Sequence, residues 1–172
     1  MSTAYTQTNA EQRAVTISEF IQTHYVDVIP DIVNSKHAFV AFQVISCGIE
    51  YLGICISSHD FVTLNNSQSD FDLALEKFPS LQKYYNLTIV QDTTVPGNHE
   101  LYGALRCGVI HDSRPKKGLT LSEKKNDLPS IIGLEDLKSD FIMACEYLLT
   151  GSIPMGGGKL LIDTFCYVNE EQ

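Results

Sequence analysis

An arginine and a histidine five positions apart are the residues of this chain whose types best suit acid–base chemistry on a phosphate. Residues 106–111 read Arg-Cys-Gly-Val-Ile-His, an R-x4-H spacing. A guanidinium such as that of Arg106 is permanently charged and binds phosphate oxygens through two parallel hydrogen bonds. An imidazole such as that of His111 exchanges a proton near neutral pH. Together the two groups suit metal-free RNA cleavage, in which a base activates the ribose 2′-hydroxyl while a cation stabilises the phosphate.

The helix that carries these residues must bring them together. Five residues turn about 500° around a regular α-helix, so the two side chains of a straight helix point roughly 140° apart. They meet only if the helix ends or is distorted before His111. Pro115 disfavours helix at the residue before it, so we predict a helix over residues 99–111 that ends beside His111. The hexapeptide by itself also fits a surface arginine and a histidine stabilised by the dipole at a helix C-terminus.

Positive charge gathers around this motif. The chain has 12 basic and 21 acidic residues, a net charge of −9, which argues against a general nucleic-acid-binding surface. Residues 102–126 nevertheless hold six basic and two acidic residues, and the remainder holds six basic and nineteen acidic ones. Arg114, Lys116 and Lys117 are therefore the candidate RNA-binding residues that would attract an anionic backbone. A solvated basic hairpin is the alternative interpretation.

A long apolar segment, Ala38 to Ile56, predicts the central helix, over roughly residues 36–58. Its clearly polar members, Gln43, Ser46 and Glu50, fall on one helix face. The length suits a bilayer, but a carboxylate near the middle of a membrane span is costly, so we expect a helix covered by other helices and no membrane. A buried carboxylate needs a partner. We predict Arg106 as the partner of Glu50, with backbone or water at the edge of the bundle as the alternative.

The remaining pattern predicts one mainly α-helical domain over residues 1–172 with a small β-hairpin. Apolar spacing predicts the other helices at residues 11–25, 69–78 and 134–150. Pro30 is expected to interrupt the helical pattern and to leave residues 31–33 as a short turn. The segments 119–121 and 128–132 are expected to pair as the hairpin. Residues 1–10 and 151–172 are expected to be peripheral arms.

Neither a metal nor a cofactor is expected. The five cysteines form no CxxC pair, which argues against a disulfide framework and against a thiolate zinc site. The histidines lack metal-ligand spacing, and the sequence around Gly156–Lys159 lacks the register of a phosphate loop. The first residues show no basic start followed by an apolar segment, so the expected location is the cytoplasm.

The segment 101–111, LYGALRCGVIH, together with the preceding apolar helix and its internal acid, resembles the HEPN superfamily of α-helical domains. In active members an R-x4–6-H motif forms a metal-independent endoribonuclease site at a homodimer interface. The resemblance implies a HEPN-like bundle, catalytic positions for Arg106 and His111, a homodimer, an RNA substrate and a toxin or defence setting with an antitoxin-like protein partner. Active members usually place a polar residue directly after the arginine, where this chain has Cys107.

Two functions follow from these observations. In the first, the chain is an RNA endonuclease: His111 is the general acid or base, Arg106 binds the phosphate and Glu50 orients Arg106. In the second, it is a non-catalytic, homodimeric HEPN-like module that binds a protein or a nucleotide, and Arg106 and Glu50 form a structural pair. The relative position of Arg106 and His111 distinguishes the two.

Overall fold

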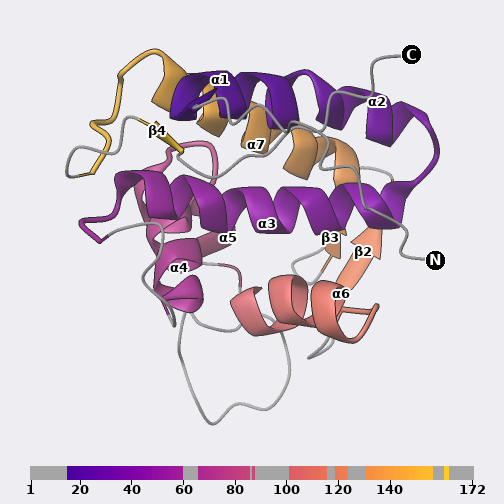
Figure 1. The fold of residues 1–172 in the computed structure, drawn as a ribbon. Helices are drawn as coiled ribbons and strands as arrows, with labels where there is room; N and C mark the ends of the chain where they lie inside the picture. Colours follow the sequence, from indigo (N-terminus) through magenta and orange to yellow (C-terminus); the bar gives the residue numbers. More distant parts are fainter. Residues whose placement is uncertain are drawn as a thin grey trace, which may run out of the picture.

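The computed structural model describes residues 15–59, 66–85, 87, 101–115, 119–123, 131–156 and 161–162. Helices dominate it, which confirms the mainly α fold (Figure 1). The helices are α1 (Ile17–Ile21), the π-helical η1 (Gln22–Val26), α2 (Val28–Asn34), α3 (Ala38–Ile56), α4 (Ser67–Lys77), α5 (Gln82–Tyr85), the π-helical η2 (Tyr102–Cys107), α6 (Gly108–His111) and α7 (Leu134–Leu149). The strands are β1 (Val15–Thr16), β2 (Thr120–Ser122), β3 (Ile131–Gly133) and β4 (Leu161–Ile162).

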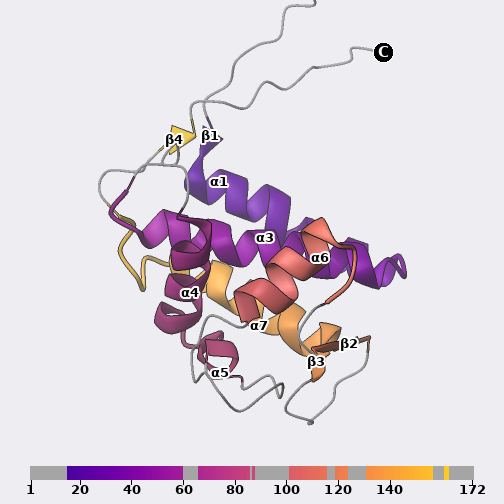
Figure 2. The ribbon, with the colours of Figure 1, turned by 90° about the horizontal axis from the view of Figure 1, so that it is seen from below.

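Helix α3 lies at the centre of the other helices, as predicted (Figures 1 and 2). It packs against α2, α4, η2, α6 and α7. Ile45, Ile49 and Leu52, spaced by one helical turn each, are fully buried on its inner face. In length and composition α3 would also suit a membrane span, and more than half of that apolar stretch is buried inside the structure.

Two glycines allow α3 to approach its neighbours closely. A Cβ atom on Gly53 would lie 1.8 Å from the backbone oxygen of Asp70 in α4. A Cβ atom on Gly48 would lie 2.3 Å from the ring of Phe141 in α7. Glycine in a helix interior costs about 1 kcal/mol relative to alanine. These two positions offset that cost by letting the helices of the core pack in direct contact.

The expected interruption at Pro30 is wrong. Helical structure continues through α1, η1 and α2, and it includes residues 31–33. The amide of Asp27 donates to the carbonyl of Gln22, five residues earlier, at 3.0 Å. This π-helical turn comes directly before α2, and Pro30 then lies in the first turn of α2, where its ring and missing N–H are tolerated.

The two predicted strands pair with each other, but in parallel rather than as an antiparallel hairpin. Thr120 aligns with Ile131 and Ser122 with Gly133. Both strands are three residues long, so the parallel ladder is short. β3 then leads directly into α7. At the chain ends, β4 pairs antiparallel with β1, whereas residues 1–10 lie outside the described residues.

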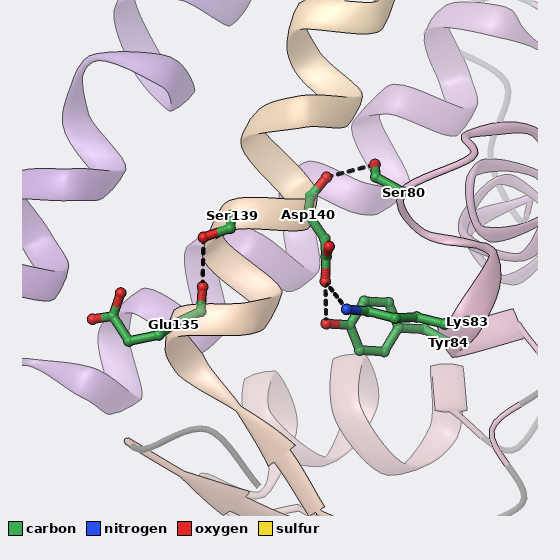
Figure 3. Close-up of polar contacts among 6 residues, drawn as sticks. All are labelled: Ser80, Lys83, Tyr84, Glu135, Ser139 and Asp140. Carbon is green, nitrogen blue, oxygen red and sulfur yellow. Dashed lines mark hydrogen bonds and ion pairs between the residues drawn. The ribbon is translucent and has the colours of Figure 1, made fainter. Parts of the chain in front are cut away.

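A polar cluster around Asp140 fixes the segment that contains α5 against α7 (Figure 3). The Tyr84 hydroxyl donates to Asp140 Oδ2 at 2.6 Å, and Lys83 Nζ lies 2.6 Å from the same oxygen. Ser80 Oγ donates to the backbone carbonyl of Asp140 at 2.7 Å. Burial, followed by this hydrogen bond, raises the pKa of Tyr84 above its ordinary value. The cluster therefore holds two elements of the fold together.

Candidate functional site

Arg106 and His111 lie on one continuous helical segment formed by η2 and α6. The amide of Gly108 donates to the carbonyl of Gly103, five residues earlier, so the segment is π-helical through Arg106. This π-helical turn ends at Cys107, and residues 108–111 are α-helical, so the distortion precedes most of the span between Arg106 and His111. The two side chains meet where the helical segment ends.

The segment ends directly after His111. The amides of Asp112 and Arg114 both donate to the carbonyl of Gly108, at 3.1 and 3.2 Å. Between them Ser113 adopts a left-handed conformation, with a φ of 54°. A left-handed residue reverses the chain at many helix ends. His111 is consequently the last helical residue and its side chain is exposed.

Arg106 contacts both of the other predicted catalytic residues. Its Nε donates to Glu50 Oε2 at 2.7 Å, and its Nη1 lies 3.2 Å from His111 Nε2. A guanidinium has no acceptor, so His111 Nε2 must accept this hydrogen bond and must carry no proton. The neutral ring then bears its proton on Nδ1. The structure thus places Glu50, Arg106 and His111 in one connected group, hereafter the Arg106 site.

The Arg106 site is buried at the acid and exposed at the histidine. The side chains of Arg106 and Glu50 are 19% and 12% exposed, so most of this ion pair is out of water. Burial lowers the pKa of Arg106, but the charge of Glu50 and its hydrogen bond outweigh burial and raise it. Arg106 therefore keeps its positive charge although much of its side chain is buried.

Among the residues that the structure describes, one edge of the Arg106 guanidinium has no hydrogen-bond acceptor against it. The ring of Tyr102 lies 5.8 Å from Arg106 Cζ, within the range of a cation–π contact. Within the described part of the chain, Arg106 Nη2 has no hydrogen-bond partner. Burial and then a hydrogen bond with Cys107 raise the pKa of Tyr102, while Arg106 lowers it. The site can therefore offer neutral Tyr102 and the remaining N–H donors of Arg106 to an anion.

The polar face of α3 docks the η2–α6 segment. Gln43 Nε2 donates to the carbonyl of Val109 at 3.2 Å, two turns before Glu50 contacts Arg106. Ser46 differs, because its hydroxyl is buried and donates to Phe42 of its own helix at 2.6 Å. The role of Gln43 was not predicted. The signal for it was its alignment with Glu50 on one helix face.

The predicted RNA-binding residues are described only in part. Arg114 is exposed just beyond the end of α6, whereas Lys116 and Lys117 lie outside the described residues. Among the residues that the structure describes, no group of three or more His, Cys, Asp or Glu side chains could hold a metal ion. Cys107 is half-buried beside Arg106, and Cys47 is exposed on α3. Partial burial of the thiol raises the pKa of Cys47, which favours the neutral thiol.

A second histidine–carboxylate pair, which the sequence did not indicate, joins the end of α3 to α4. His59 Nε2 lies 2.7 Å from Asp70 Oδ1, and the Asp70 side chain is buried. Asp70 is in the first turn of α4, and its carbonyl contacts Gly53 closely. We interpret this pair as a structural contact that satisfies a buried carboxylate.

Comparisons with known proteins found no counterpart: no protein-family model, curated protein or solved structure matches this chain.

Proposed function

We propose that this chain is a metal-independent endoribonuclease of the HEPN type that acts as a homodimer. The observation that carries the proposal is the double contact of Arg106, to Glu50 at 2.7 Å and to His111 at 3.2 Å. It joins an oriented cation to an unprotonated imidazole nitrogen at the exposed end of a helix. These are the two groups that phosphodiester cleavage without a metal needs.

The geometry supports a specific sequence of events. A phosphate oxygen of the RNA binds Arg106 at Nη2 and replaces His111 as the acceptor of Nη1. His111 Nε2 is then released and takes the proton of the adjacent ribose 2′-hydroxyl. The 2′-oxygen attacks phosphorus, and the bond to the 5′-oxygen breaks. The products are a 2′,3′-cyclic phosphate and a 5′-hydroxyl. The proton on the 5′-oxygen comes from a second acid, the protonated imidazolium of the other copy in a homodimer, which is left neutral while His111 keeps the proton of the 2′-hydroxyl.

Glu50 acts through Arg106 and is a positioning residue. Its carboxylate accepts from Nε, which fixes the plane of the guanidinium and leaves the Nη atoms to bind other acceptors. The charge of Glu50 also offsets the cost of removing Arg106 from water. A phosphate that binds this guanidinium meets a group already held in orientation.

The outer face of α3 supports the homodimer. Val40 is 44% exposed, Val44 is half-buried and Cys47 is exposed, and these residues follow one another at helical spacing. This apolar stripe runs beside the Arg106 site, on the helix that also carries Gln43 and Glu50. A two-fold interface that covers it would bring two copies of the site, and two Cys47 thiols, near one axis.

Mild oxidation tests the dimer. We expect oxidation to give a disulfide-linked dimer that is absent in Cys47→Ser. We also expect the reduced protein to have the mass of a dimer in analytical ultracentrifugation. A monomer at micromolar concentration, with no Cys47 cross-link, would contradict the homodimer.

The non-catalytic module is the second candidate, and the burial of the Arg106–Glu50 pair favours it. A mostly buried ion pair can have a purely structural role, which here is to hold η2 against α3. The departure at Cys107, where active relatives by resemblance carry a polar residue, favours it as well. In this case the site binds a protein or a nucleotide and leaves RNA intact.

One experiment separates the two functions. Purified protein is incubated in EDTA with a single-stranded RNA and with the same strand carrying 2′-deoxyribose throughout. The nuclease cuts only the RNA and leaves 2′,3′-cyclic phosphate ends. Intact RNA at every pH and salt concentration overturns the nuclease, and binding of the RNA without cleavage supports the module.

A further inference from the structure

A pocket of about 440 Å³ opens at the beginning of α3. Phe39 and Phe42 of α3 and Leu121 of β2 provide its apolar lining. Val40 also lines the pocket and begins the exposed stripe of α3, so it lies at the boundary between the two surfaces. Phe42 is buried, whereas Phe39 is 36% exposed and presents part of its ring to solvent. The volume falls in the range of small-molecule sites, which are mostly apolar with a few polar groups.

The polar groups of the pocket are two basic side chains and one acid. Lys36 and His37, from the turn before α3, line the pocket, and Glu123, directly after β2, lines it from the other element. Both Lys36 and Glu123 are exposed. A ligand in the pocket would therefore meet an aromatic ring, a cation and a carboxylate.

The pocket lies beside the histidine end of the Arg106 site. Gln43, one turn after Phe39 and Val40, binds the carbonyl of Val109, and α6 ends two residues later at His111. Figures 1 and 2 show the end of α6, strand β2 and the start of α3 at the same end of the molecule. A strand whose phosphate contacts Arg106 therefore passes close to the pocket.

We infer that this pocket binds one unpaired base of the RNA strand held by Arg106, an inference that rests on the proposed function. Single-stranded RNA is recognised by stacking of splayed-out bases on aromatic side chains and by hydrogen bonds to base edges. Phe39 provides the stacking surface, and Lys36 provides a cation for the adjoining phosphate. A paired base remains stacked in its duplex, so the pocket selects single-stranded substrate.

Glu123 gives the pocket a preference among bases. A carboxylate accepts hydrogen bonds, and it pairs with the exocyclic amino group of cytosine. Adenine and guanine also carry an exocyclic amino group, whereas uracil carries none. The pocket therefore prefers an amino-bearing base to uracil.

Binding of non-cleavable oligonucleotides tests the inference apart from catalysis. Fluorescence anisotropy is measured for the full chain with single-stranded 2′-O-methyl oligo(C), oligo(A) and oligo(U). The wild-type protein binds oligo(C) and oligo(A) more tightly than oligo(U), and Glu123→Gln reduces this difference. Phe39→Ala weakens binding of oligo(C) about tenfold, within the range for removal of one stacking aromatic. Thermal unfolding of each variant confirms that it is folded.

The salt dependence separates base binding from phosphate binding. Phe39→Ala leaves the slope of log affinity against log salt unchanged, because no phosphate contact is lost. Arg114→Ala is the matched control. If Arg114 contacts a phosphate, this variant makes the slope less steep by about one and leaves the base preference intact.

Two results would overturn the inference: no binding of any oligonucleotide, or equal binding by wild type and Phe39→Ala. Equal binding accompanied by a loss of dimer mass in Phe39→Ala would make the pocket a protein contact. Failure of the proposed function gives a different pattern, in which RNA remains uncut while Phe39-dependent binding persists.

Discussion

Arg106 Nη1 lies 3.2 Å from His111 Nε2 across the junction of a π-helical and an α-helical turn. Because the guanidinium can only donate, the contact exists only while Nε2 carries no proton. The same guanidinium is fixed on its other side by Glu50. An anion that replaces His111 at Nη1 therefore releases an unprotonated nitrogen beside itself.

The tautomer of His111 is directly measurable. The 15N spectrum of the imidazole in the neutral protein should show a protonated Nδ1 and an unprotonated Nε2. Arg106→Ala removes the donor, so the two neutral tautomers should mix. His37, which lies on another element, serves as the control within the same spectra and should not change. A protonated Nε2 in the wild-type neutral ring would contradict the contact.

Replacing Glu50 by glutamine should separate positioning from binding. Glu50→Gln keeps an acceptor for Arg106 Nε but removes the charge, so the hydrogen bond weakens and the guanidinium is held less firmly. We expect kcat for RNA cleavage to fall about tenfold with a smaller change in KM, and the free energy of unfolding to fall by about 1–3 kcal/mol. Glu146→Gln on the exposed face of α7 is the matched control and should change neither. A loss of stability in Glu50→Gln without any change in kcat would show that Glu50 has only a structural role.

Gly53→Ala should destabilise the fold. The added Cβ would lie 1.8 Å from a backbone oxygen of α4, which cannot move without shifting that helix. Overpacking of this kind costs about 2–3 kcal/mol, which corresponds to a decrease in Tm of about 5–10 °C for a chain of this size. Gly48→Ala should cost less, because its Cβ meets the ring of Phe141, which can turn or shift. An unchanged Tm in Gly53→Ala would show that α3 and α4 pack less closely than the structure indicates.

Alkaline pH should destabilise the protein through its buried tyrosines. Burial is the main cause that raises the pKa of Tyr25, Tyr51 and Tyr84 above the ordinary 10.0. The unfolded chain therefore loses these protons near pH 10 while the folded chain keeps them. Stability is fully retained below pH 10 and falls above it, by up to about 1.4 kcal/mol per pH unit for each tyrosine.

Urea unfolding followed by circular dichroism between pH 8 and 11 measures this loss. Tyr84→Phe should make the decrease above pH 10 less steep, whereas Tyr147→Phe on the surface should leave it unchanged. Identical pH profiles for wild type and Tyr84→Phe would contradict the buried, hydrogen-bonded state of Tyr84.

The central helix and its contact with Arg106 were predictable from local chemistry. The apolar run predicted residues 36–58 as helix, and the structure has 38–56. An acid within that run required a partner, and the nearby arginine of the R-x4-H motif supplied it. Both inferences depend only on which side chains of the helix are buried, and the spacing of apolar residues in the sequence indicates this.

The π-helical turns and the strand direction were not predictable in the same way. An i→i+5 turn at Arg106 has no composition signal, and here it accompanies the docking of Gln43 on Val109, a contact between residues far apart in the sequence. Pro30 failed as a helix stop because a second π-helical turn precedes it. The residue patterns of β2 and β3 suit either strand direction, so their parallel pairing has no signal in the sequence. The pocket at Phe39 was missed because its residues continue the apolar pattern of α3.

The rate of RNA cleavage in EDTA by wild-type protein and by His111→Ala tests the central claim most directly. Both proteins are compared at equal concentration, after circular dichroism has shown the same folded state. We predict cleavage by the wild type and a rate lower by a factor of about 100 or more in His111→Ala, the range for loss of a general acid–base group. Equal rates in the two proteins, or no cleavage by either, would contradict the assignment of the Arg106 site as a nuclease centre.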